Sequence, residues 1–187
     1  NNIKWIDLVI CNLYPFSETI SKIDCDQALA LENVDIGGPT MIRSAAKNVG
    51  WVTVIIDPSD YERVLENINE KNEINFETRS SLSSKAFGHT AQYDTIIHNY
   101  LKESKLSNDF TLTYKKHSDM RYGENPHQAA SAFQIPGDKS NGILNAKIHQ
   151  GKKLSYNNIM DADAALSCLK EFKSTADDSL IISKLIN

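Results

Sequence analysis

The sequence predicts an α/β fold in which short parallel strands are joined through helices. Two apolar runs of strand length, residues 6–11 and 51–56, are rich in β-branched side chains, and helical patterns lie between them. Strand, helix and strand in this order form a crossover unit, which requires parallel pairing. Hydrophobic residues make up 41% and charged residues 24% of the 187 positions. These values are typical of globular proteins and exclude disordered, collagenous and coiled-coil chains.

Four helical segments are expected before residue 105. They are residues 25–31, a helix that begins after Gly37 and Gly38, residues 58–69, and residues 75–104, the last as one helix or two. Pro39 suits the first turn of the second helix, where a backbone N–H is not needed. Gly88 weakens the middle of the fourth segment.

Beyond residue 107 the sequence changes character, and we expect two domains, residues 1–112 and 113–187. The expected elements of this later part are a strand at 110–115, a polar loop at 121–128, a short strand near Ile143, a helix at 161–172 and a strand at 179–186. The later part is therefore also expected to mix helices and strands.

Charge and cysteine content exclude several kinds of partner. Twenty basic and 24 acidic residues give a formal net charge of −4, so a basic surface for nucleic acid or an anionic membrane is not expected. No apolar stretch approaches the ~18 residues of a membrane-spanning helix, which predicts a cytoplasmic protein. Cys11, Cys25 and Cys168 are odd in number and widely spaced, so neither a disulfide framework nor a metal site is expected.

The segment Asn12-Leu13-Tyr14-Pro15-Phe16 follows the first predicted strand. Ligands of open parallel sheets bind outside the carboxyl ends of the strands, so Asn12 and Tyr14 are placed to meet a substrate. Packing of an aromatic side chain at a strand-to-turn corner explains the same residues without a ligand. Both interpretations stay open at this point.

A second segment, residues 35–48, begins with Asp35 and two glycines and carries Arg43 and Lys47 on one helix face. Free N–H groups in the first turn of such a helix favour an anion or an oxyanion. An ordinary capped helix with cations at its negative end is the alternative. Because Pro39 and Lys47 are ~12 Å apart on a straight helix, Asp35 and Lys47 share a small site only if the helix is short or the chain folds back. Otherwise they contact opposite ends of a nucleotide-sized ligand.

Two polar segments follow in the second part. Residues 121–128 place Arg121, Tyr122 and His127 in one loop, which supplies a planar fork for phosphate or carboxylate, an aromatic hydroxyl and a proton carrier. A solvated loop would have the same composition. Residues 156–161 form a polar turn that enters a helix, and Asp161 is a suitable cap for it.

Together these segments resemble the AICAR transformylase/IMP cyclohydrolase family, the bifunctional enzymes of purine biosynthesis. The matching segments keep the family's order and span nearly the whole chain: residues 7–9, 12–16, 35–48, 85–87, 89–91, 93–94, 121–128 and 155–163. The family is much longer than this chain, so the resemblance identifies a fragment across the junction of two domains, and we expect the fragment alone to be inactive. By resemblance, the first domain is a methylglyoxal-synthase-like cyclohydrolase and the second a cytidine-deaminase-like transformylase.

The resemblance implies the last two steps of IMP synthesis, carried out by a homodimer without a metal. AICAR would take a formyl group from 10-formyltetrahydrofolate, and formyl-AICAR would close its ring with loss of water to give IMP. Carried over by motif, Lys47 transfers the proton in ring closure, with Tyr14 and Asp35 to orient or relay. The nucleotide site of this step would include Cys11, Asn12, Ile36, Gly37 and Arg43.

For formyl transfer, the resemblance assigns AICAR binding to Arg121, Tyr122 and Asn158, and proton movement to His127. Lys184 fits the family's transition-state lysine, but Leu185 stands where the family has its general-base histidine. Leucine cannot accept a proton, so weak or absent formyl transfer is expected unless another base acts. The alternative is a non-catalytic purine-nucleotide-binding or assembly module that has lost this chemistry.

Overall fold

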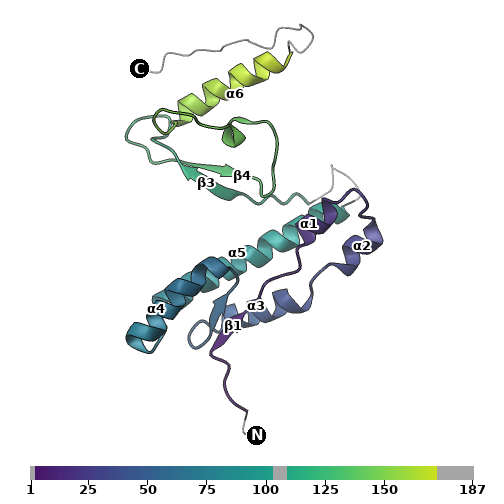
Figure 1. Cartoon of the computed structure of the whole chain (residues 1–187), viewed down its shortest axis with the longest axis vertical. Helices are drawn as coiled ribbons and strands as arrows, with labels where there is room; N and C mark the ends of the chain where they lie inside the picture. The colour runs from purple at the N-terminus through teal and green to yellow at the C-terminus, as the bar shows by residue number, and fades with distance from the viewer. Residues whose placement is uncertain (1–2, 103–108, 172–187) are drawn as a thin grey trace. The chain divides into compact units, whose positions relative to one another are not determined.

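A computed structural model of the chain describes residues 3–102 and 109–171 (Figure 1). The chain divides into two compact units, one within residues 1–111 and the other from residue 112 onward. Both units contain helices and strands, so the α/β class expected from the sequence is confirmed. No helix among the described residues is long and apolar enough to cross a membrane.

A parallel pair of strands forms the centre of the first unit. β1 (Leu8–Ile10) pairs with β2 (Thr53–Ile55), and Val9 lies opposite Val54. This confirms both expected strands and their parallel pairing. β2 is buried along its whole length, whereas Leu8 and Ile10 of β1 are exposed. The helices of this unit therefore pack mainly over β2.

Among its described residues, the first unit contains five α-helices. α1 (Phe16–Ile20), α2 (Gln27–Glu32) and α3 (Gly37–Lys47) connect β1 to β2, and α4 (Tyr61–Lys71) and α5 (Phe76–Leu101) follow. α5 is one continuous helix of 26 residues, which decides between the two alternatives left by the sequence. Figure 1 shows α5 running along the unit, with α4 near its beginning and α1 near its end.

Local interactions define where α2 and α5 begin and where α4 ends. Asp26 accepts a hydrogen bond from the N–H of Leu29 at 2.8 Å, and Asn75 accepts one from the N–H of Thr78 at 2.8 Å. Each bond satisfies a first-turn N–H that has no partner within its helix. Asn72 adopts a left-handed φ of 52° and ends α4.

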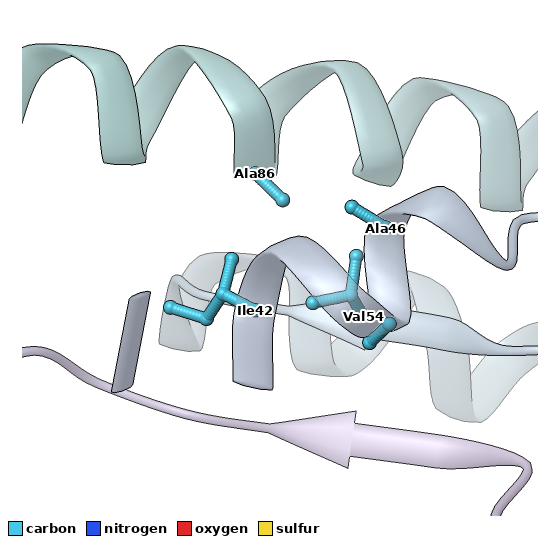
Figure 2. Packing of buried hydrophobic residues seen from close by; sticks show 5 residues of the cluster. Ile42, Ala46, Val54 and Ala86 are labelled. Atoms are coloured by element: carbon cyan, nitrogen blue, oxygen red, sulfur yellow. The ribbon is translucent and has the colours of Figure 1, made fainter. Parts of the chain in front are cut away.

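Small side chains let α3 and α5 approach each other closely. Ala46 of α3 and Ala86 of α5 face each other over Ile42 and Val54 (Figure 2). All four side chains are at most 1% exposed. In a second cluster, the ring of Phe16 makes edge contacts with two tyrosines of α5 and so fixes α1 against that helix.

The described part of the second unit, up to residue 171, contains an antiparallel pair of strands, a 3₁₀ turn and one α-helix. β3 (Lys115–Asp119) pairs with β4 (Ser131–Gln134), with an irregularity between Lys116 and Ser118. The strand expected at 110–115 is therefore wrong in position, because the residues that find backbone partners begin only at Lys115. The strand expected near Ile143 is also wrong: Ile143–Asn145 form a 3₁₀ turn closed by local hydrogen bonds.

Helix α6 (Tyr156–Glu171) begins five residues before the expected start. The hydroxyl of Ser155 accepts a hydrogen bond from the N–H of Asn158 at 3.4 Å, and Asn158 accepts one from the N–H of Ser155 at 3.1 Å. Such a reciprocal pair is typical of a helix start. Asp161 therefore lies inside the helix and does not cap it. The strand expected at 179–186 lies outside the described residues.

Candidate functional site

Asp35 connects three segments of the first unit. One carboxylate oxygen accepts a hydrogen bond from the N–H of Gly38 at 2.7 Å, and the other accepts one from the N–H of Tyr14 at 3.3 Å. The N–H of Asp35 donates to the hydroxyl of Tyr93 at 2.9 Å. The structure therefore joins the start of α3, the loop after β1 and the middle of α5 at one residue. We call these contacts the Asp35 junction.

Close packing surrounds this junction at Gly38. A Cβ atom at position 38 would lie 2.5 Å from a carboxylate oxygen of Asp35 and 2.6 Å from a side-chain carbon of Leu13. At Gly37, by contrast, a Cβ atom would meet nothing within 4 Å. Gly38 is thus required for the contact between α3 and the loop, while Gly37 borders open space.

The geometry divides the roles expected at the start of α3. The N–H of Gly38 is taken by Asp35, so at this position the capped-helix interpretation is correct. Gly37 and Ile36 are exposed on the outer side of the same turn. If the helix start contacts a ligand oxygen, the backbone around these two residues is the part that faces outward.

The loop after β1 forms one wall of a pocket of about 390 Å³. Residues 12–18 line one side, Ile56 and Pro58 lie at the end of β2, and His89, Gln92, Tyr93 and Ile96 of α5 complete it. The pocket therefore lies at the carboxyl ends of both parallel strands, where ligands of open α/β sheets bind. Asn12 and Tyr14, which the sequence predicted as site residues, both border it.

Cys11 continues the sheet beyond β1, since its N–H donates to the carbonyl of Ile55 at 3.0 Å. Burial raises the pKa of its thiol, and the nearby carboxylate of Asp35 raises it further. A thiol with a raised pKa stays protonated near neutral pH and is a poor nucleophile. Cys11 is therefore suited to contact a ligand as a neutral group.

Lys47 lies at the far end of α3 from Asp35. α3 is a continuous helix of 11 residues from Gly37 to Lys47, which corresponds to about 15 Å at 1.5 Å per residue. The helix is neither short nor folded back, so the structure does not bring Lys47 and Asp35 into one small site. Arg43 lies between them, exposed, with its guanidinium 5.6 Å from the centre of the Phe87 ring.

Side chains of α5 hold the end of α3 that carries Lys47. The hydroxyl of Ser83 donates to the carbonyl of Ala46 at 2.9 Å in a buried position. The guanidinium of Arg79 donates to the carbonyls of Val49 and Gly50 at 2.9 and 3.1 Å. These bonds satisfy carbonyl groups at and beyond the helix end, and they fix the turn that carries Lys47.

The turn after β2 is also attached to α5. Lys85 makes salt bridges of 2.8 Å to Asp57 and 2.6 Å to Asp60. The hydrogen bond from Lys85, together with that from the N–H of Ser59, holds the pKa of Asp57 well below its usual range. Because Pro58 of this turn lines the pocket, the salt bridges help to define the pocket wall.

In the second unit, Arg121 and Tyr122 form a compact pair. The guanidinium of Arg121 donates to the hydroxyl of Tyr122 at 3.1 Å and lies 4.8 Å from its ring centre. Hydrogen bonds from Ser155 and from Arg121 lower the pKa of Tyr122. The N–H of Tyr156 donates to the carbonyl of Tyr122 at 3.1 Å, so the pair lies next to the start of α6.

The loop that carries His127 is closed by its own hydrogen bonds. The N–H of Gly123 donates to the carbonyl of Gln128 at 2.8 Å, and the side chain of Gln128 accepts from the N–H of Asn125 at 3.0 Å. His127 is exposed on this loop. The amide of Asn157 donates to the carbonyl of Glu124 at 3.0 Å and connects the loop to α6.

Sequence reasoning missed several residues of these sites. His89, Gln92 and Tyr93 recur at the helical spacing of one α5 face, and this spacing is the signal that could have grouped them. Asn158, expected to bind substrate, has its carbonyl oxygen engaged at the start of α6. Lys184 and Leu185 lie outside the described residues. No group of three or more potential metal ligands occurs in the part of the chain that the structure describes.

Comparison with known proteins identifies the family. The model of the AICARFT/IMPCHase bienzyme family matches residues 45–187, more than half of the chain. The chain belongs to the AICARFT/IMPCHase family. The resemblance inferred from the sequence motifs is therefore confirmed.

Curated members of the AICARFT/IMPCHase family are similar along most of the chain. The bifunctional purine biosynthesis proteins PurH of Bacillus cytotoxicus and of Bacillus cereus strain ATCC 10987 are each 52% identical over 177 residues, 93% of this chain. The same alignments cover 35% of each relative, so the chain spans about a third of their length. A solved structure, "Crystal structure of ForH", is 38% identical and covers 49% of this chain and 48% of its own, with a TM-score of 0.44.

We predict that Gly38→Ala destabilises the first unit by about 1–3 kcal/mol, because the new methyl group overlaps Asp35 and Leu13. Gly37→Ala is the matched control and should change the free energy of unfolding by no more than about 0.5 kcal/mol. Urea unfolding of the two variants measures both values. Equal effects of the two substitutions would show that the close contact at Gly38 is not required.

We also predict that Tyr122 ionises at lower pH than Tyr93. Hydrogen bonds from Ser155 and Arg121 lower the pKa of Tyr122, whereas burial and the carboxylates of Asp35 and Asp94 raise that of Tyr93. An NMR titration with ¹³C-labelled tyrosine, assigned with the two Tyr→Phe variants, measures both values. Arg121→Gln should raise the pKa of Tyr122 and leave that of Tyr93 unchanged. The reverse order of ionisation would contradict this account.

Proposed function

We propose that this chain carries parts of both sites of a two-step enzyme of purine synthesis. The first step transfers a formyl group from 10-formyltetrahydrofolate to AICAR, and the second closes formyl-AICAR to IMP with loss of water. The observation that carries the proposal is the 52% identity to bifunctional PurH proteins over 93% of the chain. By the family resemblance, the working enzyme is a cytoplasmic homodimer that needs no metal.

The two steps are assigned to the two units. The first unit is proposed to belong to a methylglyoxal-synthase-like cyclohydrolase domain, which its parallel strands and crossover helices support. The second is proposed to begin a cytidine-deaminase-like transformylase domain. The Arg121–Tyr122 pair at the start of α6 supports this assignment, because it offers a cation and an aromatic hydroxyl to a nucleotide.

Ring closure requires the carboxamide nitrogen to attack the formyl carbon, so that a C–N bond forms and the formyl oxygen leaves as water. The developing negative charge on that oxygen needs hydrogen-bond donors, and the nitrogen must lose protons. The exposed backbone at Ile36 and Gly37 is proposed to donate to the oxygen. Lys47 is proposed to transfer a proton, and Tyr14 with Asp35 to orient the nucleotide.

The separation along α3 bears on these roles, because Ile36, Gly37 and Lys47 would act on the same reacting atoms. The side chain of Lys47 would have to extend back along α3, the direction in which helical side chains tilt. Asp35 and Lys47 lie at opposite ends of the helix, and Arg43 is exposed between them. Cys11 and Asn12 would contact the nucleotide from the end of β1.

Formyl transfer requires the amine of AICAR to attack the formyl carbon of the folate and to lose a proton. The bond between that carbon and N10 of the folate breaks, and N10 takes up a proton. Arg121, Tyr122 and Asn158 are proposed to bind AICAR, with His127 in proton movement and Lys184 stabilising the transition state. A hydroxyl whose pKa is lowered, as at Tyr122, is a stronger hydrogen-bond donor to the substrate.

A second candidate function is a non-catalytic purine-nucleotide-binding or assembly module. The observation that favours it is Leu185 directly after Lys184, because a leucine cannot act as a general base. Binding of IMP or AICAR without turnover in either step would distinguish this candidate from the enzyme.

The proposal can be tested in a chimera in which this chain replaces the aligned segment of Bacillus cytotoxicus PurH. We predict that the chimera converts formyl-AICAR to IMP and that Lys47→Ala lowers kcat/KM by at least about 100-fold, the usual effect of losing a proton-transfer group. Lys71→Ala, at the exposed end of α4, is the control and should leave the rate unchanged. A chimera that binds IMP without forming it would overturn the cyclohydrolase assignment.

For formyl transfer, we predict that the same chimera is weak or inactive and that Leu185→His restores activity by about 100-fold or more, since it supplies the missing base. The measurement is the consumption of 10-formyltetrahydrofolate in the presence of AICAR. If the unaltered chimera transferred the formyl group strongly, and the His127→Ala chimera did so as well, then neither Leu185 nor His127 would limit the reaction.

A further inference from the structure

The pocket beside the Asp35 junction is lined in part by His89 and Gln92, to which the family resemblance assigned no role. On one side, α5 presents His89 and Gln92. On the other, the loop after β1 presents Asn12 and Tyr14. These groups include two amides, which can each donate and accept hydrogen bonds, and a tyrosine ring with its hydroxyl.

The charge of this lining argues against a phosphate. Among the described residues that line the pocket there is neither a lysine nor an arginine, and Glu18 adds a negative charge. Proteins hold phosphates with such cations or with free N–H groups at helix starts. The lining instead fits an uncharged planar group that carries an amide.

The pocket is adjacent to the residues proposed for ring closure. Tyr14 lines the pocket, and its N–H donates to Asp35. Tyr93 lines it as well, and its hydroxyl accepts from the N–H of Asp35. A group bound in the pocket would therefore lie beside the Asp35 junction, while Arg43 and Lys47 lie farther along α3.

The walls of the pocket are fixed within the first unit. Lys85 holds the turn that contains Pro58 through its two salt bridges, and the Phe16 ring packs against α5. A volume of about 390 Å³ falls within the usual range for small-molecule sites, roughly 300–1,000 Å³. The pocket is thus large enough for a purine base or its imidazole precursor.

We infer that this pocket binds the uncharged amide edge of the nucleotide, with Gln92 and His89 as base-contacting residues. The amide edge is the carboxamide of AICAR and formyl-AICAR, which becomes the ring amide of IMP. Gln92 offers a complementary amide, and Tyr14 offers a ring face to the base. The phosphate would then lie outside this pocket. This inference rests on the proposed function, because that function supplies the nucleotide.

The test compares two probes in the Bacillus cytotoxicus chimera: IMP, and ribose 5-phosphate, which has no base. Gln92→Met keeps the side-chain length and removes the amide. We expect it to weaken IMP binding at least tenfold in calorimetry and to change ribose 5-phosphate binding, measured by NMR titration, less than twofold. Gln92→Glu should show the same selectivity. Gln27→Met, an exposed glutamine of α2, is the matched control and should change neither.

Three outcomes would count against the inference. If the chimera forms IMP but Gln92→Met and Gln92→Glu leave its affinity for IMP unchanged, the inference is wrong while the proposed function stands. If Gln92→Met weakened the binding of IMP and of ribose 5-phosphate equally, the pocket would contact the phosphate end of the nucleotide, and the inference would also be wrong. A chimera that neither binds IMP nor forms it would overturn the proposed function, and the inference with it.

Discussion

The carboxylate of Asp35 is the contact on which the geometry of the first unit's site depends. Its two oxygens accept from the backbone of two different segments, the loop after β1 and the start of α3. A carboxylate that accepts N–H bonds compensates for the loss of water around both partners. Without it, the loop that carries Tyr14 would have no polar connection to α3 at this point. The position of that loop relative to the helix therefore depends on one side chain.

α5 holds this junction in place, although the sheet of the first unit is small. One helix reaches the end of α3 through Ser83, the turn after β2 through Lys85, and Asp35 through Tyr93. The apolar contact between Ala46 and Ala86 brings the two helices close enough for the Ser83 bond. Burial of small side chains and polar bonds thus act together. Neither alone would position both ends of α3.

The sequence predicted the parallel strands and most of the helices because their signals are local. Apolar runs at 6–11 and 51–56, and the glycines before Pro39, are sufficient to place β1, β2 and α3. The second unit was harder to predict. The apolar alternation at 110–115 resembles a strand, but pairing with β4 occurs further along. The bonds between Ser155 and Asn158 start α6 five residues before the cap expected at Asp161.

The candidate site, too, was only partly predictable from the sequence, but for a different reason. Motifs predicted Tyr14, Asp35 and Arg121 as site residues, because each lies in a distinctive segment. Motifs could not show that both carboxylate oxygens of Asp35 accept hydrogen bonds from backbone N–H groups. These bonds form only because α3 lies close to the loop after β1 in the folded chain. A carboxylate engaged in this way holds the loop after β1 and the start of α3 together. The outward-facing turn at Gly37 and the pocket lined by α5 both remain open to a ligand.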